Sequence, residues 1–307
     1  MSRGLLAWLL CAVALTALAA DLDYRLQPRQ IAPDTWLVEG TTEFFDSRNG
    51  GNIANVVFIV TAAGVVVIDT GPSRRYGVQL RQAIAAVTDQ PILAVYLTHH
   101  HPDHALGNQA FQDVPIYALP GTAEALREQG GELSANLYRL VGDWMQGTEV
   151  VQPTATVSEG IQEIGGHRLQ FIALAGHSAG DLAILDHSTG VLVSAMVFNR
   201  RAPATPYSDL GRWLASLQRL QALDFRLLVP AAGPAGERSL IEHNADYLRW
   251  LGESLEAQAE AGVDMAEALS APIPERFSDF ALLREEYQRS VGYLYPALEQ
   301  SALEVRR

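Results

Sequence analysis

Four of the eight histidines of this 307-residue chain lie within six residues. They belong to the segment Thr98–His104, which reads Thr-His-His-His-Pro-Asp-His. In an extended or turning segment, His99 and His101 project to the same side and can bind one ion. Asp103 and His104 can then turn toward a neighbouring position. A histidine-rich patch can also be a solvated loop, but this one directly follows an apolar stretch, which favours metal ligands.

These residue types predict a zinc-type centre. Imidazole suits zinc, and an ion held by three histidines keeps a fourth position for a water molecule that can lose a proton near neutral pH. The single cysteine, Cys11, lies close to the start of the chain. Any metal in the remainder must therefore rest on His, Asp or Glu. We expect Pro102 to prevent a helix within the cluster.

The elements before the cluster are typical of an α/β protein. Val56–Thr61 and Val65–Thr70 are short runs rich in Val and Ile that predict adjacent buried strands. Helical spacing follows over residues 75–87. A further apolar strand, Ile92–Leu97, leads directly into the histidine cluster, at the end of a strand where loops carry function.

A second set of strands is predicted downstream. We expect a strand and a helix at 114–118 and 121–129, strands at 167–173, 182–185, 191–195 and 226–229, and helices at 210–223 and 239–261. Two sheets with helices outside them give an α/β fold, an αββα four-layer sandwich. Segments 41–52, 130–150 and 199–209 are predicted to be loops or loop-helix. From Met265 the chain is helical around a break at Pro272 and Pro274.

The histidine cluster resembles the His-x-His-x-Asp-His signature of the metallo-β-lactamase superfamily. Asp69-Thr70-Gly71 is similar to the upstream acidic turn of that family, and the segment Gly176–Asp181 (Gly-His-Ser-Ala-Gly-Asp) resembles its downstream motif. The resemblance implies the metallo-β-lactamase fold, with a first metal held by His99, His101 and His177. It also implies that Asp103 and His104 begin a second metal site, and that the acidic turn braces the metal loop.

Further segments resemble one branch of that superfamily, the SoxH-like quinoprotein relay system zinc metallohydrolases. They are Asn49–Asn52, Asp69–Gly77, Gly107–Phe111 and Val197–Arg201. The resemblance implies export and an association with a periplasmic, pyrroloquinoline-quinone-dependent dehydrogenase system.

Two positions depart from the family's dinuclear pattern. Ala195 stands where the bridging Asp is expected, and Ala232 stands where the last His is expected. A methyl group cannot coordinate a metal, so Asp103 and His104 are the only remaining ligands of a second site. Such a site needs four or more ligands. Asp181 is interpreted as a supporting or strand-start residue, and His187 and His243 as surface groups. We therefore expect one zinc ion.

The first residues predict export. A basic start, an apolar run from Leu5 to Ala17 and a small-residue end at Ala19 look like a signal peptide over residues 1–19. We expect a metallo-β-lactamase-like domain over 20–262 and a C-terminal helical extension over 263–307 that packs on it. The protein would be periplasmic or secreted, with no integral membrane segment after processing.

Charge and ligand types then narrow the function. The net charge is −13 and the chain contains no lysine, so nucleic acid is a poor partner and a small-molecule substrate is expected. We predict a zinc-dependent hydrolase that acts through a metal-bound water on an ester-, lactone- or lactam-like bond. Asp103 would orient the water or take its proton, and His104 would polarise the substrate or carry a proton. The alternative is a catalytically degenerate periplasmic accessory or binding protein of the quinoprotein system.

Overall fold

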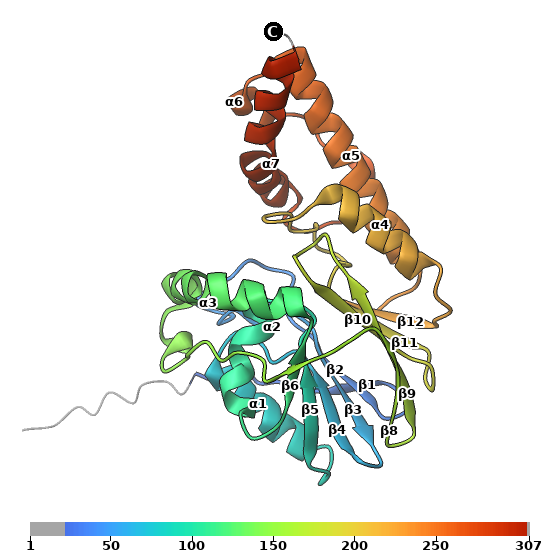
Figure 1. Cartoon of the computed structure of the whole chain (residues 1–307). Coiled ribbons are helices and arrows are strands. Elements are labelled where there is room, and N and C mark those ends of the chain that lie inside the picture. The colour runs from blue at the N-terminus through green and yellow to red at the C-terminus, as the bar shows by residue number, and fades with distance from the viewer. Residues whose placement is uncertain (1–21, 306–307) are drawn as a thin grey trace, which may run out of the picture.

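The computed structural model describes residues 22–305, and Figure 1 shows two sheets packed face to face with helices outside them. The first sheet has seven strands in chain order: β1 (Arg29–Ala32), β2 (Thr35–Val38), β3 (Val56–Thr61), β4 (Gly64–Ile68), β5 (Ile92–Tyr96), β6 (Ile116–Ala118) and β7 (Ala155–Thr156). The second has five, in the order β12-β11-β10-β9-β8: β8 (Gly160–Ile164), β9 (His167–Leu174), β10 (Asp181–Asp186), β11 (Val191–Ser194) and β12 (Leu227–Pro230).

The central strands are buried on both faces, which explains why their sequences are continuous apolar runs. Alternate side chains of a strand point to opposite faces. In β3, Val57 and Ile59 pack between the two sheets in the same core as Phe171 of β9. Val56 and Phe58 pack in the core beneath the helices of the first sheet. The loops at the ends of these strands are therefore attached to a sheet that is packed on both faces.

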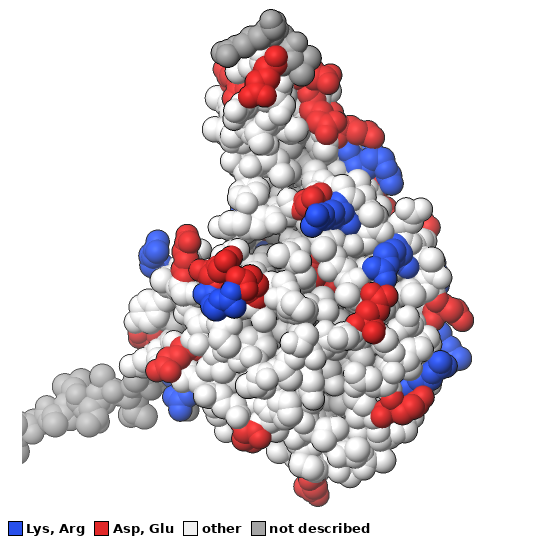
Figure 2. Space-filling view, viewed as in Figure 1, with Lys and Arg blue, Asp and Glu red and all other residues white. Residues whose placement is uncertain are grey.

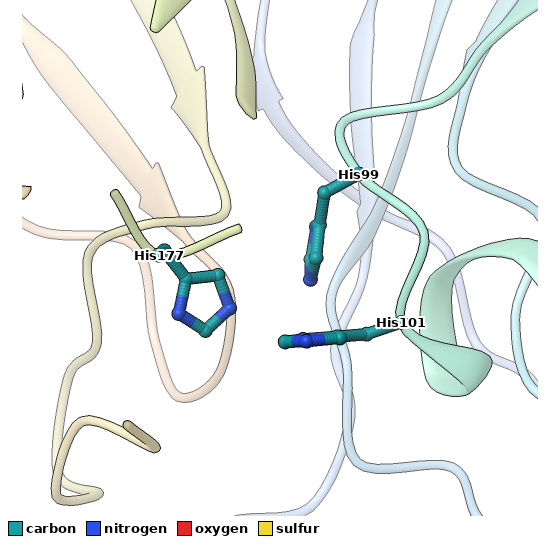
Figure 3. Close-up of side chains that lie close together, drawn as sticks. All are labelled: His99, His101 and His177. Carbon is teal, nitrogen blue, oxygen red and sulfur yellow. The ribbon is translucent and has the colours of Figure 1, made fainter. Parts of the chain in front are cut away.

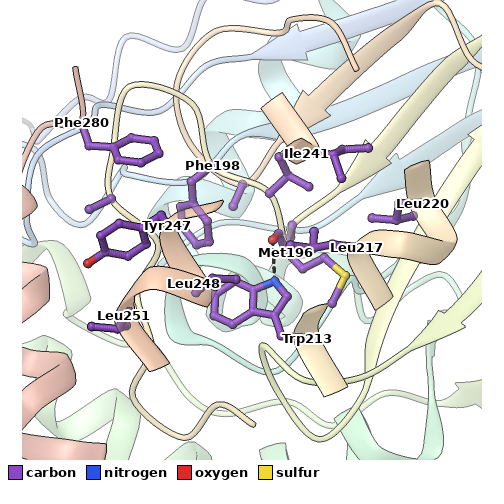
Figure 4. Packing of buried hydrophobic residues seen from close by; sticks show 14 of the residues in the cluster. Met196, Phe198, Trp213, Leu217, Leu220, Ile241, Tyr247, Leu248, Leu251 and Phe280 are labelled. Atoms are coloured by element: carbon purple, nitrogen blue, oxygen red, sulfur yellow. Dashed lines mark hydrogen bonds between the residues drawn. The ribbon is translucent and has the colours of Figure 1, made fainter. Parts of the chain in front are cut away.

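Helices cover the outer face of each sheet. The first sheet carries α1 (Arg74–Ala85), α2 (Pro102–Ala105) and α3 (Pro120–Val141), and the second carries α4 (Leu210–Gln221) and α5 (Ser239–Ala261). Trp213 of α4 is fully buried, and its indole N–H donates to the Met196 carbonyl at 2.9 Å (Figure 4). The αββα four-layer sandwich predicted from the sequence is confirmed.

The last segment of the chain is helical and packs on α5. It consists of α6 (Met265–Ala268), a 3-10 turn at Glu275–Phe277 and α7 (Leu283–Val305), which form a lobe at one end of the molecule with α5 (Figure 1). Phe277 and Tyr287 are fully buried in the same apolar cluster as Leu251 of α5. Helix α5 ends just before Gly262, whose φ of 77° is left-handed. That residues 263–307 form a separate extension stays a prediction.

Two local predictions are wrong. Pro102 does not exclude a helix, because it is the first residue of the four-residue α2, where proline lacks no needed hydrogen bond and its φ is already helical. His101 before it is extended, as we expected for the first part of the cluster, whereas His104 lies within α2. The segment 130–150 is not mainly a loop either, since α3 continues without a break to Val141. The sequence analysis also missed β1, β2, β7 and β8.

The predicted signal peptide, residues 1–19, lies outside the described residues. Within residues 22–305, no helix combines the length and the apolar character needed to cross a membrane.

Candidate metal centre

Three histidines from two distant loops converge at the ends of the strands. His99 and His101 follow β5, and His177 lies in the loop between β9 and β10. Figure 3 shows the three rings facing one another, and one candidate ligand atom from each lies within 4.8 Å of the others. Among the described residues, His, Cys, Asp and Glu side chains form one group of three or more whose ligand atoms lie this close together, and it is this triad.

Two nitrogens of the triad are buried without a hydrogen-bond partner. They are Nε2 of His99 and Nδ1 of His177, whereas Nδ1 of His99 lies 3.0 Å from the Thr98 hydroxyl oxygen. A buried polar atom without a partner is costly, and a metal ion would supply the missing partner of the His99 nitrogen. His177 turns its other nitrogen, Nε2, toward the two rings of the histidine segment (Figure 3). The donor set of three imidazoles therefore fits zinc.

Burial also keeps the triad unprotonated. It lowers the pKa of His99 and His101 well below the ordinary value, and neighbouring histidines lower both further. Burial lowers the pKa of His177 to about 3. All three rings are therefore neutral at pH 7, the form in which imidazole binds metals.

Asp69 braces the histidine segment from below. Its Oδ1 accepts from the Thr98 backbone N–H at 2.7 Å, and its Oδ2 accepts from the Thr98 hydroxyl at 2.7 Å. The same Oδ2 lies 2.7 Å from Nδ1 of His104. These are the bonds that the resemblance implied for the acidic turn, and they fix which edge of the His104 ring faces outward.

Asp103 and His104 lie beside the triad but do not complete a second ligand group. Nε2 of His104 is 3.7 Å from Oδ2 of Asp103. Burial would lower the pKa of His104, but the carboxylates of Asp69 and Asp103 raise it above its ordinary value. Ala232 lines the same pocket and offers only a methyl group.

A strained turn and a buried carboxylate hold His177. Gly176 has a φ of 127°, and a Cβ there would lie 2.2 Å from the Trp213 backbone nitrogen. Asp181, the first residue of β10, accepts from the Ser178 hydroxyl at 2.7 Å and from the Ser178 backbone N–H at 3.0 Å. Burial raises the pKa of Asp181 to about 7, although its bonds to Ser178 and to the His177 backbone oppose the shift. Asp181 therefore supports the loop of His177.

The two histidines interpreted as surface groups make partners of their own. His187 is exposed and its Nε2 lies 2.9 Å from Oε1 of Gln170. His243 is partly exposed and its Nε2 lies 3.0 Å from Oδ1 of Asp279.

A cavity of about 240 Å³ opens beside the triad. The triad, Asp103 and His104 line it, and so do two arginines, Arg201 and Arg289. Sequence reasoning missed both arginines. Arg201 ends the Val197–Arg201 segment that carries the family resemblance, but Arg289 lies far along the chain on α7 and no motif marks it.

The fold, the converging histidines and the supporting carboxylate together define a metallohydrolase-type site of one family. The model of the metallo-beta-lactamase superfamily matches residues 49–232, and the chain belongs to this superfamily.

Among curated proteins, the chain is similar to a linear primary-alkylsulfatase of Pseudomonas sp. (strain ATCC 19151), with 24% identity over 58% of this chain and 41% of that protein. The chain thus spans less than half the length of this relative. It is also similar to the acyl-coenzyme A thioesterase MBLAC2 of Gallus gallus, with 28% identity over 65% of this chain and 76% of that protein.

Solved structures show the same fold. A metallo-beta-lactamase from Pontibacter korlensis superposes with a TM-score of 0.62 at 23% identity, over 73% of this chain and 99% of that one. A metallo-beta-lactamase from Hirschia baltica gives a TM-score of 0.58 at 16% identity, over 73% and 97% of the two chains.

Proposed function

We propose that this protein is a zinc-dependent hydrolase whose ion is held by His99, His101 and His177. The observation that carries the proposal is the convergence of three neutral imidazoles, within which Nε2 of His99 is buried without a partner. The superfamily membership supports it, as do the names of the two curated relatives, which describe cleavage of sulfate esters and thioesters. The bond cleaved here is of the ester, lactone or lactam type.

The chain's own residues divide the work around that ion. Zinc bound to the triad would supply a Lewis acid and an activated water. Asp103 is only slightly exposed and faces the cavity, so its carboxylate can orient that water and accept its proton. His104 is held by Asp69 through Nδ1, so its Nε2 is the edge available to donate a proton to a leaving group.

A comparison of turnover and metal content tests these roles. We would screen lactone, thioester, sulfate ester, phosphoester and lactam substrates with the native protein, with His177→Ala and with Asp103→Asn. Hydrolysis that needs zinc and is lost in His177→Ala supports the enzyme. Asp103→Asn should lower kcat about a hundredfold while zinc content stays near the native value. Equal loss of both would make Asp103 mainly a ligand.

We further propose that the site holds one tightly bound zinc ion. Ala195 and Ala232 offer no donor, and Asp103 and His104 alone make a weak second site. Metal analysis after dialysis should give one equivalent of zinc per chain. Two equivalents that both resist dialysis would contradict this proposal.

The alanines also favour a second candidate function, an accessory or binding protein that has lost catalysis. In either case we propose a periplasmic or secreted protein of the SoxH-like quinoprotein relay branch, because of the N-terminal pattern and the segments quoted for that branch. We also propose a domain over 20–262 and an extension over 263–307. Saturable binding of a quinone cofactor without zinc-dependent turnover of any substrate would favour the accessory role.

A further inference from the structure

Two arginines reach the cavity from parts of the chain that are far apart. Arg201 lies in the loop between β11 and α4, and Arg289 lies on α7. The loop and the segment before α7 are tied together by backbone bonds: Ala202 N–H donates to the Ala281 carbonyl at 3.1 Å, and Ala281 N–H donates to the Arg200 carbonyl at 3.0 Å. The extension thus contributes a charged side chain to the same cavity as the histidine triad.

The two guanidinium groups share one carboxylate. Glu286 is fully buried and accepts from Nη2 of Arg201 at 3.3 Å. It also accepts from Nη1 of Arg289 at 3.0 and 2.8 Å. Phe44 covers both guanidinium groups, which lie 5.8 Å (Arg201) and 5.5 Å (Arg289) from its ring centroid. Because one carboxylate neutralises one guanidinium, the two arginines and Glu286 together keep one positive charge. The cavity is also lined by the carboxylate of Asp103.

Arg201 has unused hydrogen-bonding capacity. It is only 5% exposed, and its Nε has no partner among the described residues. A buried N–H without an acceptor is costly. Because this Nε is closed to the cavity, a small shift of the Arg201 side chain is needed before a bound anion can accept from it.

The positive charge of the two arginines is not part of a larger basic surface. The chain carries a net charge of −13, and the face shown in Figure 2 has acidic and basic side chains intermingled, without a broad basic area. General attraction of anions to the surface is therefore not expected, and binding of an anion depends on the arginines of the cavity.

We propose that Arg201 and Arg289 bind an oxyanion, a carboxylate or a sulfate, carried by the substrate. Arginine recognises both groups because its planar fork presents parallel N–H donors to paired oxygens. The substrate assignment rests on the proposed hydrolase function, whereas the anion site itself does not. The substrate then spans the cavity, with its scissile bond at the triad and its oxyanion at the arginines.

Binding to the zinc-free full-length protein tests the site without catalysis. Calorimetric titration would compare benzoate and benzenesulfonate with the neutral benzamide, and zinc is removed so that the ion cannot bind the anions itself. At least one anion should bind about tenfold more tightly than benzamide. The tighter of the two identifies the carboxylate or the sulfate as the natural group.

Variants on one helix provide the matched control. Arg289→Gln should remove most of the preference for the anion, and Arg289→Lys should keep part of it because the charge remains. Arg284→Gln changes an arginine of α7 that does not line the cavity and should bind as the native protein does. Thermal unfolding of each variant would verify that it is folded.

The outcomes separate this inference from the proposed function. Anion preference that depends on Arg289, with no turnover of any substrate, supports the anion site and removes the hydrolase. Zinc-dependent turnover with equal binding of benzoate, benzenesulfonate and benzamide supports the hydrolase and overturns the anion site. Unchanged anion binding in Arg289→Gln overturns it as well.

Discussion

The cavity has two walls that are built in different ways. The histidine wall consists of the triad with Asp103 and His104. These residues lie on the loop and the short helix α2 that follow β5, and on the loop after β9. The arginine wall consists of Arg201 and Arg289, and it exists only where α7 and the loop after β11 meet. We therefore predict that metal binding depends on the sandwich, and that selection of the substrate depends on how the C-terminal segment packs. Variants of one wall should therefore spare the function of the other.

The largest effect is expected from removing a ligand of the histidine wall. His177→Ala should lower zinc affinity at least about a thousandfold, or roughly 4 kcal/mol, because two imidazoles cannot hold the ion as three do. Competition with a chromophoric chelator measures this change. His187→Ala, which removes an exposed histidine bonded to Gln170, is the control and should bind zinc normally. Anion binding by the zinc-free His177→Ala protein should persist, and its loss would contradict the separation of the walls.

Phe277→Ala should disturb the arginine wall indirectly, by loosening the packing of the C-terminal segment on α5. Phe277 is fully buried and packs against Tyr247 and Trp250 of α5, so the substitution leaves a cavity that costs about 3–4 kcal/mol of unfolding free energy. We expect weaker anion binding, with zinc affinity within about twofold of native. Leu303→Ala, at a 55% exposed position of α7, should change neither. Denaturant unfolding and the two titrations provide the measurements, and a Phe277→Ala protein that loses zinc would show that the walls are coupled.

The sequence predicted the histidine wall because its cause is local. β3 was predicted with its observed bounds and β5 to within one residue, since runs of Val and Ile buried on both faces are recognisable in sequence. His99 and His101 belong to the motif that directly follows β5, whereas His177, which follows β9, was implied by the family resemblance. Whether Asp103 and His104 serve as ligands stays a prediction.

The arginine wall could not be predicted in the same way. Arg289 reaches the cavity only through the packing of α7 on α5 and on the loop after β11, and no local pattern encodes that contact. Helix α3 was predicted too short because Gly130 and Gly131 interrupt its pattern. Gly130 is accommodated for a tertiary reason, since a Cβ there would lie 2.8 Å from Val150.

A smaller effect is expected from the turn that presents His177. Gly176→Ala should destabilise the protein by about 2–3 kcal/mol, because φ is positive there and the new Cβ would meet the Trp213 backbone. Zinc affinity should fall with it, since the loop must shift. Gly131→Ala, in α3 with nothing within 4 Å of the added Cβ, should instead stabilise the protein by about 0.5–1 kcal/mol. Equal effects of the two substitutions in denaturant unfolding would refute the assigned strain.

The smallest effect concerns pH and the carboxylate behind the histidine wall. Glu286 of the arginine wall has two guanidinium partners, but Asp181 is held by neutral donors alone. Burial raises the pKa of Asp181 to about 7, above its value near 4 in the unfolded chain. Between these values the folded state binds more protons than the unfolded state, so the stability contributed by Asp181 falls as the pH rises from about 4 to 7.

Comparison with Asp181→Asn isolates the pH-dependent stability that Asp181 contributes, because the amide does not titrate. The histidines titrate in both proteins, so their contributions cancel in the difference. In zinc-free protein, the unfolding free energy of the native chain minus that of the variant should fall by about 2–3 kcal/mol between pH 5 and pH 8. A loss of stability that is the same at every pH does not affect this slope. A difference that stays constant across the range would mean that Asp181 is ionised throughout, and that its bonds to Ser178 outweigh its burial.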